Sequence, residues 1–517
     1  MARLYLVLIT FVFLVLAIFI GAAIPSGLSK STILILAFIF VPMILFWIIS
    51  SRSQWVGLTL GSTAVYFSLP LPIIWRMSPA MLWVCLLLAM IILGDCFKVS
   101  RKSLSWDWFS LSLVLSGVIV IVRVLVERPG SAELGGSGGG GEAVKIVLAY
   151  LAFWVATRIA AQPWDIRQNY RWIVVFSIIG LAVGITTFYT NLAQAEDSAE
   201  LGVLSQLYSR GTWLLSALCI TYFAFQKTRR SDAFTAFLLG SVVLLVFVGI
   251  AALTPHRSRP VFVIASFIVT AFAFKKGVSS LFPISLAGFV LLCLAIAVGF
   301  DALPSTVQRS LSTVVPIDSR TLNVTEGMSS ETGWKSEFRA QMNQLAIDKI
   351  SDSPFIGAGF GFSASDLNKV LQRAGDQNTG EIQEVAEALA LSGNYHNSIL
   401  QLAVNCGVPA AFLATIGILG LFTKFLNFAR RTVSQQTRFA SSVIICTAVP
   451  VIGQMLMNGG GTDYFNALLL LGMGNGIMQN THFQGRHEGA NGDMVSASTN
   501  SLVINRASNF AGSAHFD

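Results

Sequence analysis

Long uninterrupted apolar runs are the feature that most constrains the fold of this chain. A helix needs about 20 apolar residues to cross the hydrocarbon core of a bilayer, and runs of this kind recur along most of the sequence. Periodicity cannot separate helix from strand in continuous apolar runs, so length is the reason for expecting helices. The expected spans are residues 4–23, 32–50, 55–75, 79–97, 106–126, 143–160, 172–190, 209–225, 233–254, 260–275, 281–300, 398–425, 437–457 and 463–478.

The composition agrees with a membrane protein. Only 12% of the residues are charged and 54% are hydrophobic, whereas soluble domains contain about 25% charged residues. This difference excludes an ordinary cytosolic enzyme, a disordered chain and a nucleic-acid-binding domain. The sequence therefore predicts an all-α polytopic membrane protein with about 12–14 transmembrane helices. The first run could also belong to a signal peptide, because small residues follow it, but it is too long for the apolar core of a typical signal peptide, so we expect it to remain as a span.

The distribution of basic residues predicts the orientation. The net charge is +8, and cytoplasmic loops of membrane proteins are enriched in Lys and Arg. If Arg3 is cytoplasmic, every second loop is basic, and Glu196, Asp197 and Glu200 lie in a loop between these. Both ends of the chain are then expected in the cytoplasm. The basic loops carry Arg52; Lys98, Arg101 and Lys102; Arg167 and Arg171; Lys227, Arg229 and Arg230; Lys275 and Lys276; and Lys424, Arg430, Arg431 and Arg438.

The chain divides into four parts. Residues 1–300 carry transmembrane helices 1–11, residues 301–393 form one large periplasmic loop, residues 394–478 carry helices 12–14, and residues 479–517 form a polar, disordered cytoplasmic tail. In addition, the glycine-rich segment 127–142 is expected to be a flexible outer linker.

Short helices are expected within the large loop. Residues 336–351 have apolar side chains at helical spacing, and Asp352-Ser353-Pro354 is typical of a helix end. A second helix is predicted at 380–391. The glycines of 357–361 resemble a nucleotide loop, but they follow a proline on the outer side, so a backbone turn is the better interpretation.

No bound metal or cofactor is expected. The six cysteines form no CxxC pair, so neither a zinc site nor a disulfide framework is indicated. The outer segments contain no Asp-x-Asp or His/carboxylate set, and the acid pair Glu196-Asp197 is better explained as part of a solvated loop. Walker, Rossmann and Gly-x-Ser-x-Gly patterns are likewise not found on a strand-to-helix turn.

Several arginines lie at the outer boundary, where the orientation rule does not place them. Each could simply extend its charged end to the membrane surface. Together they are better explained by an anion site, because the planar guanidinium matches a phosphate or diphosphate. These residues are Arg210, Arg257, Arg259, Arg320 and Arg339.

His396 is the candidate general base. It lies where the outer loop returns to the membrane, between Tyr395 and Asn397. A histidine there could be only an interface residue. Its unperturbed pKa of about 6.5 nevertheless suits proton transfer near neutrality, and Asn397 can cap the helix that follows.

The residues around this point resemble the O-antigen ligase/polymerase superfamily. Segment 354–361 (Pro-Phe-Ile-Gly-Ala-Gly-Phe-Gly) is similar to its Pro…Gly-x-Gly-x-Gly element, and segment 395–409, which begins Tyr-His-Asn-Ser, is similar to its His-Asn element. Ser258-Arg259 resembles its Ser-Arg element at the start of a span. Arg339 precedes Pro354 at the distance often found in the family. The resemblance covers about residues 205–425.

The resemblance implies a metal-independent, inverting glycosyltransferase with a GT-C-like membrane fold in the bacterial inner membrane, its active site facing the periplasm. Such an enzyme moves a glycan from undecaprenyl diphosphate to a hydroxyl of lipid A–core, as a ligase, or of a growing polysaccharide, as an O-antigen or exopolysaccharide polymerase. By resemblance, Arg210 and Arg259, with Arg257, bind the donor diphosphate and His396 is the base. Arg339, Arg320, Asn397 and Tyr395 are candidates for acceptor binding or loop support.

Two other classes of function stay open. A flippase for a polyprenyl-linked saccharide would also have many spans, but transporters place polar sites at mid-depth. Here Asp95, Arg123 and Arg158 lie near the ends of their spans, and the other candidates gather at one face, which favours an enzyme. A structural scaffold is the weaker alternative, because it does not need a histidine beside arginines.

Overall fold

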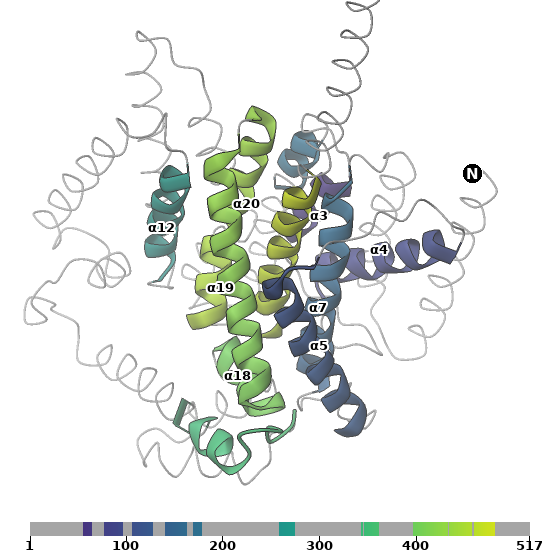
Figure 1. The fold of residues 1–517 in the computed structure, drawn as a ribbon, viewed down its shortest axis with the longest axis vertical. Coiled ribbons are helices and arrows are strands. Elements are labelled where there is room, and N and C mark those ends of the chain that lie inside the picture. Colours follow the sequence, from purple (N-terminus) through teal and green to yellow (C-terminus); the bar gives the residue numbers. More distant parts are fainter. Residues whose placement is uncertain are drawn as a thin grey trace, which may run out of the picture.

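The computed structural model describes about two fifths of the chain, and most of this part is helical. The described residues are 55–64, 77–96, 106–127, 140–162, 169–177, 258–273, 343–344, 346–360, 397–432, 434–457 and 460–480. They form no β-strand, which confirms the all-α class. The named helices are α3 (Trp55–Ala64), α4 (Pro79–Cys96), α5 (Trp108–Glu127), α7 (Gly140–Ala160), α12 (Ser258–Ala273), α18 (Ser398–Cys406), α19 (Val408–Arg431) and α20 (Gln435–Met457) (Figure 1).

Membrane-spanning length is confirmed for several predicted segments. Within the described residues, four helices are long and apolar enough to cross a bilayer: Trp108–Glu127, Gly141–Ala160, Val408–Arg431 and Thr437–Leu456. The chain is therefore an all-α polytopic membrane protein. The total number of spans stays a prediction, because the segments at 4–23, 32–50, 209–225, 233–254 and 281–300 lie outside the described residues.

The apolar run at 398–425 was expected to form a single span, and this expectation is wrong. It is divided at Gly407 into α18 and α19. Gly407 has a φ of 87°, a left-handed conformation that glycine adopts without steric cost. Pro409 then lies in the first turn of α19, where a missing N–H costs no helical hydrogen bond.

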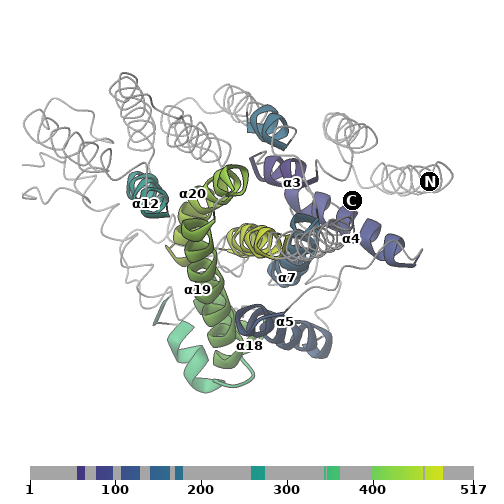
Figure 2. The ribbon, with the colours of Figure 1, turned by 45° about the horizontal axis from the view of Figure 1, so that its top comes forward.

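The centre of the bundle is the helix at 461–480. Nearly all of its residues are buried, and Figure 2 shows it enclosed by α7, α19 and α20. Gly472 and Gly476 lie against the backbone carbonyls of Phe153 and Thr157 on α7. This small-xxx-small spacing lets two helices approach closely in a membrane.

The antiparallel helices α5 and α19 define two faces of the molecule. Gly417 of α19 packs against Leu113 of α5, and the outward side of the pair is apolar and exposed, with Trp108 83% and Leu419 55% exposed. Twenty residues of α-helix are about 30 Å long, the thickness of the hydrocarbon core. We call the end with Glu127 and Val408 the loop face and the end with Trp108 and Arg431 the opposite face.

Candidate functional site

A tight backbone turn at the loop face begins the candidate site. Helical residues 346–352 end at Asp352, as expected, and the turn runs from Ser353 to Phe360. The Gly357 N–H donates to the Ser353 carbonyl at 3.0 Å, and the Ser353 hydroxyl donates back to the Gly357 carbonyl at 3.1 Å. Gly357 has a φ of 80°, which a residue with a Cβ rarely adopts. The predicted backbone turn at 357–361 is thus confirmed as far as Phe360.

The turn is held against the break between α18 and α19. The Ala358 N–H donates to the Val404 carbonyl at 2.6 Å, and the Val408 N–H donates to the Pro354 carbonyl at 2.7 Å. Gly357 and Gly407 lie at the contact itself. A Cβ on Gly357 would be 2.6 Å from the Cys406 backbone nitrogen, and one on Gly407 would collide with the Phe355 carbonyl. Glycine is therefore needed at both positions for the turn to pack against the helix break.

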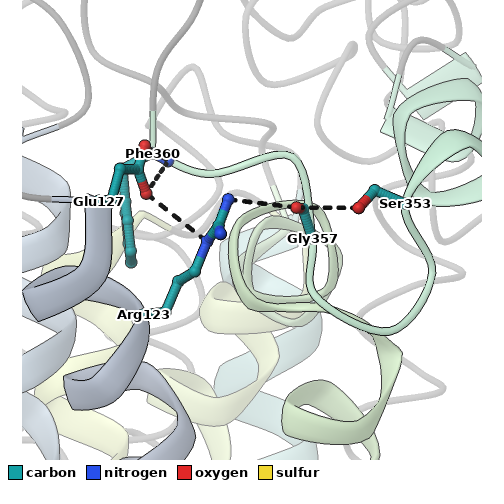
Figure 3. A network of polar contacts seen from close by, with 5 residues as sticks. All are labelled: Arg123, Glu127, Ser353, Gly357 and Phe360. Carbon is teal, nitrogen blue, oxygen red and sulfur yellow. Dashed lines mark hydrogen bonds and ion pairs between the residues drawn. The ribbon is translucent and has the colours of Figure 1, made fainter.

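Arg123 and Glu127, on the last turn of α5, anchor the same turn (Figure 3). The Arg123 guanidinium donates to the Gly357 carbonyl at 3.3 Å, and its Nε lies 3.7 Å from Glu127 Oε2. Glu127 Oε1 accepts the Phe360 N–H at 3.0 Å. The two side chains are 21% and 26% exposed, so water weakens these contacts only in part. We call Arg123, Glu127, Ser353, Gly357 and Phe360 the turn anchor.

The start of α18 lies at the same face and is capped as predicted. Asn397 Oδ1 accepts the N–H groups of Ile399 at 3.0 Å and Leu400 at 3.1 Å, which satisfies two donors that a helix start leaves unpaired. The Ser398 hydroxyl donates to the Gly460 carbonyl at 3.3 Å. The start of α18 is therefore capped by Asn397 and joined through Ser398 to the residue that precedes the central helix.

A buried chain of hydroxyl groups joins these helices near the middle of α5 and α7. The Ser116 hydroxyl donates to the Ala410 carbonyl at 2.8 Å and lies 2.5 Å from the Tyr150 hydroxyl. Tyr150 in turn lies 2.7 Å from the Tyr464 hydroxyl. Hydrogen bonds between buried hydroxyls are favourable because an unpaired polar group in an apolar interior is costly. The chain joins α5, α7, α19 and the central helix.

Most of the residues predicted for the site lie outside the described residues. This holds for Arg210, Arg257, Arg320, Arg339, Tyr395 and His396. Arg259 is the second residue of α12, which begins at Ser258, two residues before the span expected at 260–275. The Ser-Arg pair therefore opens the helix, as the resemblance implied. Phe262, one turn later, packs against Gly453 near the end of α20. Gly460 follows the end of α20 closely, and its carbonyl accepts the Ser398 hydroxyl at the loop face. The start of α12, which packs near the end of α20, therefore also lies at the loop face.

Sequence reasoning missed the turn anchor. It noted Arg123 only as a charge near the end of a span and did not consider Glu127. The available signal was the i, i+4 spacing of opposite charges at the outer end of an apolar run. Among the described residues, no three His, Cys, Asp or Glu side chains gather as a metal site would require, and metal independence stays a prediction.

The comparison with protein families identifies the same region. Residues 250–415 match the family model of O-antigen ligase. The matched segment includes the start of α12, the turn at 353–360, Asn397 and the break at Gly407, and it lies within the segment 205–425 that carried the resemblance. No curated protein matches the chain. The family match supports an O-antigen ligase-like superfamily assignment.

Proposed function

We propose that this chain is a membrane glycosyltransferase that moves a glycan from undecaprenyl diphosphate to an acceptor hydroxyl, in the manner of an O-antigen ligase acting on lipid A–core. The match over residues 250–415 supports ligase- or polymerase-type glycosyl transfer. The observation that carries the proposal is the pair of hydrogen bonds joining the glycine turn to the break at Gly407. Both elements belong to the matched segment, and we call the hydrogen-bonded surface that they form at the loop face the floor of the proposed site.

The donor diphosphate is assigned to arginines. When the glycan leaves its carrier, negative charge develops on the diphosphate, and prepositioned cations in a partly dry site stabilise that charge better than water does. Arg259 is the best supported, because α12 begins beside it at the loop face. Arg210 and Arg257 complete the proposed set. Arginine suits this task because its fork binds two phosphate oxygens at once.

The acceptor is assigned to His396. A sugar hydroxyl is a poor nucleophile until a base removes its proton, and His396 directly precedes the cap of α18. The hydrogen bonds of Asn397 fix the backbone immediately after the proposed base. Direct attack on the donor would invert the anomeric centre, without a metal ion. Arg320, Arg339 and Tyr395 are proposed to support the loop or the acceptor.

The surface around the floor of the proposed site is apolar, which is compatible with a lipid carrier. Phe355 and Ile356 at the tip of the turn are 78% and 64% exposed, although both are apolar, and the exposed side of α5 leads toward them. An apolar surface at a membrane boundary is compatible with a polyprenyl chain. The alternation of basic loops supports a periplasmic position of this face, and the resemblance to the superfamily supports the bacterial inner membrane.

A polymerase of the same superfamily is the second candidate, because the same family match supports it. A flippase is third. A deletion strain complemented with the wild-type chain or with His396→Gln separates them by the glycan profile. A ligase predicts that polymer accumulates on the carrier and is missing from the lipid core. A polymerase predicts a core with a single repeat unit. Normal glycans in the deletion strain would refute both, and full rescue by His396→Gln would remove His396 from the mechanism.

A further inference from the structure

A pocket opens at the opposite face, about 30 Å from the turn anchor along α5. Its volume is about 880 Å³, and it lies between the start of α5 and the last turns of α19. Trp106 and Phe109 form part of its apolar wall. Asp107, Lys424, Asn427 and Arg431 supply polar groups. The proposed transfer reaction uses none of these residues.

The pocket carries a net positive charge. Lys424 and Arg431 are cations, and Asp107 is the single acidic residue among the described lining residues. Lys424 pairs with the Asp107 carboxylate, which also accepts the Ser110 N–H at 2.8 Å. An ammonium group has three donors, so this pair leaves Lys424 able to donate to a second acceptor. Arg431 is exposed at the end of α19 and adds a guanidinium fork.

An exposed apolar stripe continues from the pocket along α19 toward the loop face. It begins at Leu419, which lines the pocket, and continues at helical spacing through Ile416, Phe412 and Val408, all of them exposed. Trp106 also lines the pocket, and tryptophan is enriched at the depth of lipid headgroups. A ligand with an anionic head and an apolar chain matches the pocket and the stripe together, whereas a soluble anion would use only the pocket.

We propose that the pocket binds the headgroup of an anionic phospholipid in the leaflet of the opposite face. The phosphate lies between Arg431 and Lys424, and one acyl chain follows the exposed stripe of α19. Basic pockets between transmembrane helices bind such headgroups by this chemistry. The site is independent of the transfer reaction, because it lies at the other membrane face.

The test measures lipid binding to the purified full-length protein in a neutral detergent by native mass spectrometry. The probes are phosphatidylglycerol and phosphatidylcholine of equal chain length. Arg431→Gln is expected to weaken phosphatidylglycerol binding about fivefold, the effect of one basic residue near an anionic headgroup, and to leave phosphatidylcholine binding unchanged. Arg430→Gln is the matched control, because this neighbouring arginine on α19 is not among the residues that line the pocket. It is expected to bind both lipids as the wild type does.

Three results would overturn the proposal. The first is unchanged phosphatidylglycerol binding in Arg431→Gln. The second is an equal loss in Arg430→Gln, which would indicate attraction to the basic surface in general. The third is displacement of the lipid by glycerol phosphate at an equal concentration, which would show that the ligand is a soluble phosphate ester. Arg431 is exposed at a helix end, and elution of each variant as a single species checks that it is folded.

Discussion

Replacing Arg123 by methionine is expected to loosen the turn at 353–360 without unfolding the protein. Methionine keeps most of the length and the apolar stem of arginine but removes its charge and its donors. The substitution eliminates the hydrogen bond to the Gly357 carbonyl and the ion pair with Glu127. The remaining hydrogen bonds of the turn, including the one from Phe360 to Glu127, can persist.

The size of the effect follows from the geometry. A hydrogen bond from a charged donor contributes about 1.5–3 kcal/mol, and at 3.3 Å with a partly exposed arginine the lower value applies. An ion pair that is accessible to water adds about 0.5 kcal/mol. The free energy of opening the turn should therefore fall by about 2 kcal/mol, which corresponds to an increase of about 30-fold in the open population.

Amide hydrogen exchange measures this opening directly. Exchange of a protected amide proceeds through local opening, so the Gly357 and Ala358 amides should exchange about 30-fold faster in Arg123→Met than in the wild type. Arg158→Met is the matched control. Arg158 lies near the end of α7 at the opposite face, over the ring of Trp154, and its loss should leave the turn unchanged.

Glu127→Gln measures how much the charge of Glu127 contributes to the turn anchor. Glutamine retains an acceptor for the Phe360 N–H but not the charge that faces Arg123, so its effect should be smaller than that of Arg123→Met. Exchange in Arg123→Met within about twofold of the wild type would refute the anchoring role. So would a larger effect in Glu127→Gln than in Arg123→Met.

Four further outcomes follow from the proposed reaction and topology. A reporter at Ala340 should be periplasmic and one in the tail cytoplasmic; a cytoplasmic reporter at Ala340 would overturn the orientation. Arg210→Ala or Arg259→Ala should abolish transfer in a protein that still inserts, lysine should rescue poorly because it lacks the bidentate fork, and full activity of both alanine variants would end the diphosphate assignment. Chelator should leave transfer by the purified protein unchanged, and a loss restored by magnesium would reveal a missed carboxylate site. His396→Ala should slow transfer by about 10²–10⁴-fold while donor binding survives; intact transfer would exclude it as the base.

The transmembrane helices could be predicted because the length of an apolar run is sufficient to identify a span. The runs at 106–126 and 143–160 need no knowledge of the fold, since a membrane leaves helix as the only solution for a continuous apolar segment. The cap at Asn397 was predictable for a similar reason, because a cap depends only on the residues that follow it. Local chemistry was sufficient in both cases.

The break at Gly407 and the turn anchor were not predictable in the same way. An apolar run that contains Gly407 has the length of a continuous span. Gly407 and Pro409 permit a break, and the turn packed against Gly407 is what the sequence around it does not reveal. Arg123 and Glu127 have the spacing of an ion pair, but their acceptor and donor in the turn lie more than 200 residues later in the chain. The i, i+4 spacing therefore predicts the ion pair between Arg123 and Glu127, but it does not predict the turn that these two side chains bind.

The turn anchor also changes what the family match implies about the rest of the chain. The matched segment ends at residue 415 and begins at residue 250, so it contains the turn, the break and the start of α12 but neither Arg123 nor Glu127. Two backbone hydrogen bonds join the turn to the break within that segment, and the charged contacts that fix the turn to the membrane bundle come from α5. The hydroxyl chain through Ser116 likewise ties α5 to Ala410, just after the break. Helix α5, which precedes the matched segment, thus supports the floor of the proposed site. We predict that a substitution of Arg123 or Glu127 alters the proposed transfer without contacting donor or acceptor.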